Sequence, residues 1–515
     1  MITNLIEPLR RPDILDCIAN LSSDEVFTPP SIANQVLDLL PAEIWTDPKI
    51  KILDPCAKSG VFLREAVKRL MTGLAAAIPD EDERRAHIFK NMLYGIAITE
   101  ITGLISRRSL YYSKDASSEW SVSGFNDEQG NVHYSRGKHV YKAGKCVHCN
   151  APEGSLDRGE HLENYAYQFI HKPLWEIFSM KFDVIIGNPP YQLEDEGHGA
   201  SAAPIYQKFV EQAKKLNPRY FSMIIPARWY SGGKGLDSFR AEMLGDKRIK
   251  VLVDYPKLYD AFPGVKIRGG ICYFLWDREH KGKCRVQTMW DGLPLGAAVE
   301  RYLDEYDVLV RRNEAVSILK KIKEVSAAID GGKTLDQIVS SRKPFDFPTT
   351  YHGAGSRSNV KEPTKFYGSQ KITWIERSTI LRNLDWVHQW KVLMTRVQGT
   401  SAAVETKYLS NPIISGPGEA CSETYLVVGP FSDKETAEYC AAYLRTRFAR
   451  FLVSLRKATQ DAAKDVYAFI PLVPLDRVWT DKDLYDRYGL TGDEIAFVED
   501  TVFPMLERDA DENEQ

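Results

Sequence analysis

Short apolar runs alternate with segments of helical periodicity over roughly the first 290 residues of the chain. The runs are rich in Val, Ile and Leu, which predicts buried strands of a parallel sheet. The expected strands cover residues 50–54, 93–98, 182–187, 220–226, 249–253 and 270–276. The expected helices cover roughly residues 32–40, 61–70 and 204–216. This order predicts an α/β domain built on a doubly wound sheet.

Other parts of the chain depart from this alternation. Residues from about 117 to 165 are polar and rich in Gly, Ser and His, so we expect an insertion there. Beyond a charged, helical stretch at 297–325, residues 340–420 lose helical periodicity and residues 430–475 regain it. The predicted organisation is a first domain over residues 1–299, a second, α+β domain over residues 300–505, and an acidic disordered tail over residues 506–515.

The composition describes a globular protein with room for two or three cores. The chain has 515 residues, of which 43% are hydrophobic and 27% are charged. It carries no charged-then-apolar leader pattern and no apolar run of membrane-spanning length, so we expect no membrane association and a cytoplasmic location. Eight cysteines in a chain of this length indicate a reducing compartment rather than a disulfide framework.

The net charge of −3 does not by itself indicate nucleic-acid binding, but a DNA-binding cleft needs only local positive charge. One basic cluster lies between Tyr443 and Asp461, beside an apolar stripe at helical spacing. Its basic residues are Arg445, Arg447, Arg450, Arg456 and Lys457. The pattern fits a solvated surface helix and also a helix that contacts phosphates, and the sequence leaves both open.

The strand expected at residues 182–187 runs into an unusual loop, in the sequence FDVIIGNPPYQ. Two consecutive prolines, Pro189 and Pro190, fix their own φ angles, lack N–H donors and hold the preceding residue in extended geometry. The loop therefore presents the Asn188 amide, backbone carbonyls and the Tyr191 ring at the end of a strand, where open α/β sheets bind ligands. A lone Asn-Pro pair would indicate an ordinary turn, whereas these four residues after a buried strand favour a site for a flat, amine-bearing ring.

Four motifs occur in a telling order: VFTPP at 26–30, LDPCAKSGVFL at 53–63, LYGIAI at 93–98 and GNPPYQ at 187–192. In this order the chain resembles the gamma class of N-6 adenine-specific DNA methyltransferases, the TaqI-like enzymes of restriction-modification systems. The resemblance implies a Rossmann-like methyltransferase domain, S-adenosylmethionine as cofactor, double-stranded DNA as substrate with base flipping, and a C-terminal target-recognition domain. A separate restriction endonuclease, in the cytoplasm of a prokaryote, is the implied partner.

The resemblance also assigns roles to particular residues. The implied catalytic residues are Asn188, Pro189, Pro190, Tyr191 and Phe262. Asn188 and the Pro189 carbonyl would accept hydrogen bonds from the target amine, and Tyr191 would stack on the base. Phe262 would contact the base from the other side, with a plain core aromatic as the alternative. The implied cofactor-binding residues are Thr28, Pro29, Asp54, Pro55, Cys56, Gly60 and Ile98.

Three positions depart from the pattern of the family. Lys58 stands where many relatives have Gly, which is a minor departure. The acid that usually binds the ribose hydroxyls is replaced by Ala97, and the acid expected near Pro173 is missing. Glu100 and Asp115 are candidate substitutes for these acids, but neither lies at the expected place, so we expect weaker cofactor binding.

The insertion contains a pair of cysteines, Cys146 and Cys149, at the spacing Cys-x2-Cys. Histidines surround the pair in the sequence: His133, His139, His148, His161 and His171. Two thiolates at this spacing and two imidazoles would make a tetrahedral structural Zn²⁺ site, which would stabilise a segment too polar to fold alone. The alternative is a pair of inert thiols in a polar loop.

Two rival functions remain open from the sequence. Methyltransferases of RNA and of protein glutamine also use Asn-Pro-Pro-Tyr, although they lack a large C-terminal half. The missing acids also allow a DNA-recognition subunit with impaired catalysis. The recognition sequence itself cannot be read from residues 300–475, because base contacts depend on geometry.

Overall fold

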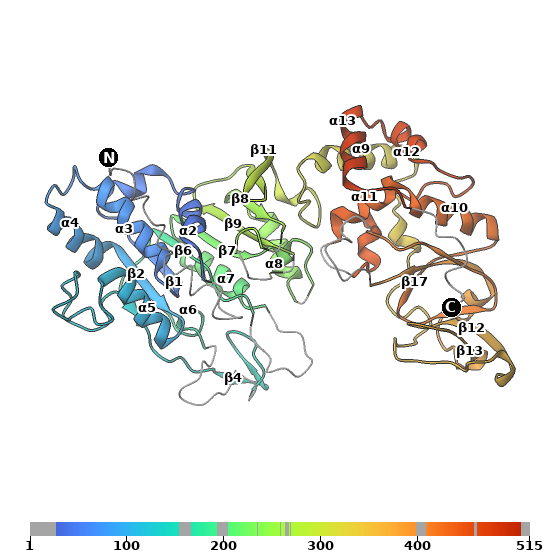
Figure 1. Cartoon of the computed structure of the whole chain (residues 1–515), viewed down its shortest axis with the longest axis horizontal. Coiled ribbons are helices and arrows are strands. Elements are labelled where there is room, and N and C mark those ends of the chain that lie inside the picture. Colours follow the sequence, from blue (N-terminus) through green and yellow to red (C-terminus); the bar gives the residue numbers. More distant parts are fainter. Residues whose placement is uncertain are drawn as a thin grey trace, which may run out of the picture. The chain divides into compact units, whose positions relative to one another are not determined.

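The computed structural model describes residues 27–153, 166–192, 204–233, 235–257, 259–262, 267, 269–397, 408–457 and 461–505. Backbone contacts divide the chain into two compact units, Met1–Leu309 and Val310–Gln515 (Figure 1). The acidic tail expected at residues 506–515 lies outside the described residues. Within the described ranges, no helix combines the length and the apolar character that crossing a membrane requires.

Nine strands of the first unit, among its described residues, form one sheet. Their order across the sheet is β11 (Leu293–Arg301), β10 (Cys284–Trp290), β8 (Ile249–Tyr255), β9 (Ile271–Asp277), β7 (Tyr220–Pro226), β6 (Val184–Gly187), β1 (Ile52–Ala57), β2 (Leu93–Ala97) and β3 (Val132–His133). The five strands from β7 to β3 run parallel, and β9 is antiparallel to both of its neighbours. The predicted α/β fold with a mostly parallel sheet is confirmed.

Strand β1 lies at the point where the order of the sheet reverses. The chain continues from β1 outward through β2 to β3, and then returns to β6 on the other side of β1. Ile52 of β1 pairs with Leu93 on one side and with Val184 on the other. In open α/β sheets, ligands bind at the carboxyl ends of the strands beside such a switch point. The loops after β1 and β6 carry two of the four motifs.

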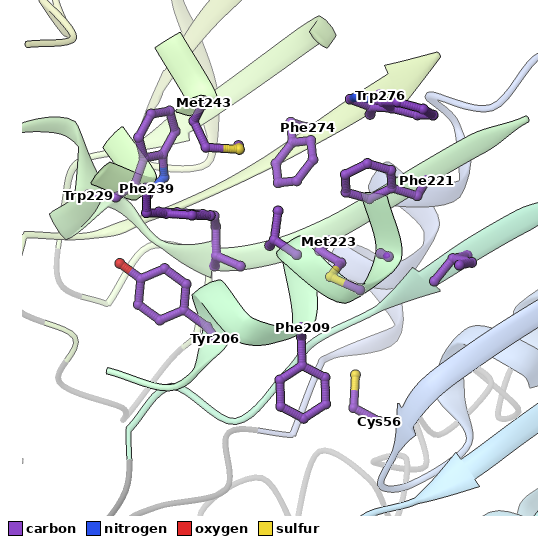
Figure 2. Close-up of a cluster of buried hydrophobic side chains, with 14 of the residues drawn as sticks. Cys56, Tyr206, Phe209, Phe221, Met223, Trp229, Phe239, Met243, Phe274 and Trp276 are labelled. Atoms are coloured by element: carbon purple, nitrogen blue, oxygen red, sulfur yellow. The ribbon is translucent and has the colours of Figure 1, made fainter. Parts of the chain in front are cut away.

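Both faces of the sheet are buried. Along β6, Ile185 belongs to one apolar cluster, while Val184 and Ile186 belong to another, because successive side chains of a strand point to opposite faces. This double burial explains the continuous apolar runs in the sequence. Figure 2 shows part of the first cluster, with Cys56 of β1 near Phe209.

The helices of the first unit flank this sheet (Figure 1). Those among the described residues are α2 (Pro30–Leu37), α3 (Val61–Gly73), α4 (Glu81–His87), α5 (Glu100–Tyr111), α6 (Gln168–His171), α7 (Tyr206–Leu216) and α8 (Asp237–Gly245). Helix α2 begins at a proline, which suits the first helical position because its missing N–H would have no partner there. The predicted helices at 32–40, 61–70 and 204–216 correspond to α2, α3 and α7.

The insertion is more closely tied to the domain than its polar composition suggested. It supplies the edge strand β3, followed by the hairpin β4 (Tyr141–Lys142) and β5 (Lys145–Cys146). Cys146 and Cys149 are buried in the same apolar cluster as Ile185 of the central sheet. The description of the cysteines as lying in a polar loop was therefore wrong. Residues 154–165 lie outside the described part of the chain.

The strand β11 at one edge of the sheet is bulged and exposed. Leu293, Leu295 and Val299 are each more than a third exposed. The pairing with β10 shifts in register beyond Val299, and Gly296 has a φ of 64° at this irregularity. The prediction of a charged helix from about residue 297 was wrong at its start, because strand β11 continues to Arg301.

The second unit contains both strands and helices among its described residues. One sheet is formed by β13 (Ile372–Glu376), β12 (Pro363–Tyr367) and β16 (Glu419–Cys421), and another by β15 (Ile413–Ser415), β14 (Trp390–Thr395) and β17 (Tyr425–Phe431). The helices are α9 (Glu314–Ile329), α10 (Lys434–Arg445), α11 (Arg447–Arg456), α12 (Asp481–Tyr488) and α13 (Gly492–Thr501). The mixed strand and helix content of residues 340–475 agrees with the pattern of the sequence.

The basic segment from Tyr443 is two helices rather than one exposed helix. Thr446 separates α10 from α11, and its hydroxyl accepts a hydrogen bond from the Ala449 N–H as the cap of α11. Arg450 is 1% exposed and its Nε donates to the carbonyls of Arg445 and Thr446. Both expectations for this segment, a solvated surface and a row of phosphate contacts, fail for Arg450 because its charge is turned inward.

Candidate functional site at the ends of β1 and β6

The Asn-Pro-Pro loop begins where β6 ends at Gly187. Asn188 is 3% exposed, and Pro189 and Pro190 are buried as well. The strand that carries them is fully buried, so the start of the loop is fixed by the core. The prolines then restrict the directions that the backbone can take. The sequence therefore places a buried side-chain amide at a rigid corner of the sheet.

The end of β1 lies directly against this corner. A Cβ atom on Gly187 would lie 2.7 Å from the Cys56 sulfur, which is closer than real contacts allow, and 3.0 Å from the Asp54 carboxylate. The Asn188 backbone also hydrogen-bonds the Cys56 thiol. Only glycine permits this approach, so the two motif loops lie next to each other at the switch point.

Thr28 joins the same site from the segment before α2. The Asn188 Nδ2 donates to the Thr28 Oγ1 at 3.1 Å, and both side chains are buried. The neighbouring Pro29 is the residue before α2 and is half-buried. Three segments that are distant in sequence thus meet around one amide: the Thr-Pro-Pro segment, the end of β1 and the end of β6.

Burial controls the ionisation of the acid and the thiol at the end of β1. Asp54 Oδ1 accepts a hydrogen bond from the Cys56 N–H at 3.1 Å. Removal from water nevertheless dominates and raises the pKa of the Asp54 carboxyl to about 7. Burial likewise raises the pKa of the Cys56 thiol, so the thiol is neutral at physiological pH.

The loop from β1 to α3 makes a tight turn. Pro55 lies within β1, where it cannot donate to the ladder, and the pairing with β2 shifts between Asp54 and Ala57. Gly60 has a φ of 74° and precedes the first residue of α3. The turn directs the loop to a helix N-terminus, whose N–H groups suit polar or anionic ligands. Gly60, like Asp54 and Cys56, therefore borders the switch point.

The two aromatic residues of the expected site lie in or against one core cluster. Tyr191 is half-buried, and burial of its hydroxyl raises the pKa of this group. Phe262 is 2% exposed and belongs to the same cluster. Its burial matches the alternative of a core aromatic. A contact of either ring with a base stays a prediction.

The end of β2 shows what replaces the expected acid. Ala97 is 2% exposed and is paired with Ala57 of β1, and Ile98 is buried directly after it. Glu100 follows in the first turn of α5 with an exposed side chain. Asp115 instead accepts hydrogen bonds from Ser117 in the insertion. Glu100 is therefore the acid that lies nearest in the chain to the end of β2.

A second cluster of functional groups lies in the insertion. The ligand atoms of His139, Cys146, Cys149 and His171 all lie within 4.8 Å of one another. Burial opposes ionisation of Cys146, but hydrogen bonds from the backbone of Cys149 and His148 outweigh it and lower the pKa of this thiol to about 7. Burial lowers the pKa of His171 to about 4, so its imidazole is neutral.

The sequence predicted the two cysteines of this cluster but did not select its histidines. Of the five histidines considered, the structure brings His139 and His171 to the sulfurs. His161 lies outside the described residues. His148 lies inside the Cys-x2-Cys loop, with its ring tilted against that of His171 at 5.4 Å between centroids, but it does not belong to the cluster. No spacing in the sequence singles out His139 and His171, because their approach to the sulfurs depends on how the insertion packs on α6.

Sequence comparisons place this arrangement among known proteins. Residues 91–262 match the family model described as Eco57I restriction-modification methylase. A protein of Mycoplasma pneumoniae described as an uncharacterized adenine-specific methylase is 37% identical over 344 residues, which cover 61% of this chain and 79% of that protein.

The solved structures that match this chain share little sequence with it. A DrdV–DNA complex matches with a TM-score of 0.45 and 12% identity, over 89% of this chain and 56% of the other. The type IIL restriction-modification enzyme MmeI in complex with DNA matches with a TM-score of 0.43 and 10% identity, over 92% of this chain and 73% of the other. A modification subunit of a putative type I restriction enzyme from Vibrio vulnificus YJ016 matches with a TM-score of 0.34 and 17% identity, over 54% of this chain and 51% of the other. The chain thus spans about half the length of that subunit.

The Mycoplasma pneumoniae relative is the most informative of these, because the chain covers most of its length at substantial identity. The family model adds the type of methylase, and its range includes the Asn188 loop. The chain therefore belongs to the adenine-specific methylases of the restriction-modification type.

Proposed function

We propose that this protein transfers the methyl group of S-adenosylmethionine to the exocyclic amine of adenine in DNA. The observation that carries the proposal is the buried Asn188 amide at the carboxyl end of β6, held next to Thr28 and to the end of β1. This is the position at which an open α/β sheet brings two ligands together. A carbonyl-rich, proline-fixed corner is suited to an amine.

The chemistry follows from the groups that the corner presents. An adenine amine is a poor nucleophile because its lone pair is delocalised into the ring. If the Asn188 Oδ1 and the Pro189 carbonyl accept its two N–H bonds, the lone pair localises and points out of the ring plane. The hydrogen bond from Asn188 to Thr28 holds the amide in one orientation before the base arrives. Such preorganised alignment accounts for roughly 7–11 kcal/mol in well-oriented reactions.

The methyl donor would lie beside the end of β1. Its electrophilic sulfonium methyl supplies the group that is transferred. The residues that would hold it share the edge of the sheet at the switch point: Thr28, Pro29, Asp54, Pro55, Cys56, Gly60 and Ile98. The fit of this set rests on the close approach of Gly187 to Asp54 and Cys56. This approach brings the loop after β1, proposed for the methyl donor, against the loop after β6, proposed for the target base. Glu100 is our candidate for the ribose hydroxyls in place of Ala97.

The DNA substrate requires that the target base leaves the duplex. An amine inside a stacked duplex cannot reach a buried corner, so base flipping is part of the proposal. Tyr191 would stack on the flipped base, and such stacking contributes about 1–3 kcal/mol per base. Phe262 would act from the opposite side. Residues 300–505 are proposed as the target-recognition domain, and a separate restriction endonuclease as the partner.

The finer assignments remain predictions of the sequence. These are membership of the gamma class, a prokaryotic cytoplasmic location, and a structural zinc ion bound by Cys146 and Cys149. None of them is needed for the transfer step at Asn188.

Labelled S-adenosylmethionine and mixed-sequence DNA test the proposal directly. The wild-type protein should form N-6 methyladenine, and Asn188→Ala should lower the rate by at least roughly 100-fold, because the orientation of the amine is lost. Asn91→Ala, at an exposed asparagine of the same unit, is the matched control. Transfer that survives Asn188→Ala would refute the assignment of this loop.

The rival functions are separated by changing the acceptor and by measuring donor binding. Methylation of RNA or of a release-factor glutamine, with none of DNA, would replace the proposed substrate. The absence of an acid at Ala97 favours a second candidate, a DNA-recognition subunit with impaired catalysis. Calorimetric titration with S-adenosylmethionine decides this point, because such a subunit would show no binding of the donor.

A further inference from the structure

We propose that His139, Cys146, Cys149 and His171 together bind one Zn²⁺ ion, which fastens the insertion to the segment that precedes the catalytic strand. The proposal is independent of the methyl-transfer chemistry. It rests on four residues that the chain brings together from the segment before β4, from the end of β5 and its loop, and from α6.

The distances suit a tetrahedral centre. All four ligand atoms lie within 4.8 Å of one another, and the Cys149 Sγ lies 3.5 Å from the His139 Nδ1. Zinc bonds of about 2.0–2.3 Å place the ligands of a tetrahedral site roughly 3.3–3.8 Å apart. The observed cluster is therefore at or slightly above the size that zinc requires. Two sulfurs and two nitrogens are a ligand set typical of structural zinc.

The backbone of the Cys-x2-Cys loop holds both sulfurs on one side. The Cys146 N–H donates to the Ala151 carbonyl at 2.8 Å, and the Asn150 N–H donates to the Cys146 carbonyl at 2.9 Å. Asn150 closes the loop with a φ of 64°. The Cys146 sulfur in turn receives hydrogen bonds from the backbone of Cys149 and His148. These bonds fix the position of the Cys146 sulfur beside the other three ligand atoms.

His171 is oriented as a metal ligand. Its Nδ1 donates to the Tyr167 carbonyl at 2.9 Å, which leaves the lone pair on Nε2. That Nε2 atom is buried and has no hydrogen-bond partner among the described residues. A second-shell bond from one ring nitrogen to a carbonyl, with the other nitrogen directed at the metal, is the usual arrangement of zinc-binding histidines. A metal ion would satisfy the nitrogen that the protein leaves unpaired.

The proposed ion would join parts of the chain that are separated in sequence. Cys149 and His171 are separated in sequence, so binding of both to one ion would remove freedom from the unfolded chain. Helix α6 carries His171 and also Phe169, which stacks on Phe209 of α7 at 5.8 Å. Since α7 follows the catalytic loop and α6 precedes the catalytic strand, the ion would anchor the insertion against both.

Metal analysis of the purified full-length protein is the first test. Elemental analysis after dialysis without chelator should find about one zinc ion per chain. Replacement of the metal by Co²⁺ should give the absorption of a tetrahedral centre, including thiolate-to-metal charge transfer. Zinc below about a tenth of an equivalent, in protein purified and refolded with zinc present, would overturn the proposal.

Variants of two neighbouring histidines separate a ligand from a nearby ring. His171→Ala should lose the zinc and the cobalt spectrum, whereas His148→Ala, whose ring lies 5.4 Å from that of His171, should keep both. His139→Ala should behave like His171→Ala. A ligand variant that unfolds would lose zinc for that reason alone. The number of zinc ions per chain in folded His148→Ala and in the wild type therefore decides the result. Equal zinc content in His171→Ala and the wild type would contradict the proposed ligand set.

Discussion

The side chains of Thr28 and Asn188, 160 positions apart in the chain, are joined by a buried hydrogen bond of 3.1 Å. The bond links the segment before α2 to the loop after β6. An amide that must accept hydrogen bonds from an incoming amine gains from a fixed partner, since its orientation is set before binding. The bond therefore joins the residue proposed to contact the cofactor to the residue proposed to hold the base.

Removal of the Thr28 hydroxyl should slow methyl transfer. Thr28→Val keeps the shape but leaves the Asn188 Nδ2 without this partner, so kcat should fall by roughly 10- to 100-fold. Thr28→Ser keeps a hydroxyl and should retain most of the activity. Single-turnover transfer rates compare the variants, and calorimetry with S-adenosylmethionine checks donor binding. Unchanged kcat with weakened donor binding in Thr28→Val would show that Thr28 acts only in binding the cofactor and does not orient Asn188.

A methyl group at Gly187 should disrupt the site from within the core. Gly187→Ala would drive a Cβ into the Cys56 sulfur and the Asp54 carboxylate, which should lower the free energy of unfolding by about 1–3 kcal/mol and weaken donor binding. Gly245→Ala, at the exposed end of α8 with no atom within 4 Å of the new Cβ, is the control and should be neutral or slightly stabilising. Urea unfolding of both variants measures the difference. Equal stabilities would contradict the close packing of the two loops.

The buried Asp54 should make stability depend on pH near neutrality. Its pKa is raised to about 7 in the folded protein and returns to about 4 on unfolding. Between these values the folded state holds the extra proton, so the free energy of unfolding falls as the pH rises from about 4 to 7. Asp54→Asn should remove this part of the pH dependence of the free energy of unfolding.

The pH effect is isolated by comparing variants at each pH. Unfolding of the wild type and of Asp54→Asn from pH 5 to 8 should show the variant gaining relative stability as the pH increases. Asp38→Asn, which breaks a surface pair with Arg69, is the control because exposed pairs contribute little. Parallel curves for the wild type and Asp54→Asn would contradict a raised pKa.

Much of the catalytic half could be predicted from local sequence. The strands that lead into the Asp54 and Asn188 loops are continuous apolar runs, and Gly60 and the two prolines mark the turns after them. Strand Tyr220–Pro226 was predicted to the residue. These features are set by burial and by backbone restrictions within a few residues, so they can be read without the fold.

Other features depend on contacts between distant segments. The inward turn of Arg450 follows from the break at Thr446, which separates two helices that look continuous in the pattern of arginines and leucines. The choice of His139 and His171 among five histidines depends on how the insertion packs on α6. Neither could be derived from spacing, because the deciding partners are not neighbours in sequence.

The bulged strand β11 has a consequence for how the protein behaves at high concentration. A regular edge strand with exposed Leu293, Leu295 and Val299 would offer another molecule a template for pairing backbone to backbone. The break in register around Gly296 twists that row of donors and acceptors out of line. At the opposite border, β3 is only two residues long. Both edges of the sheet are therefore poorly suited to pairing with the edge of another molecule, even though one of them is apolar.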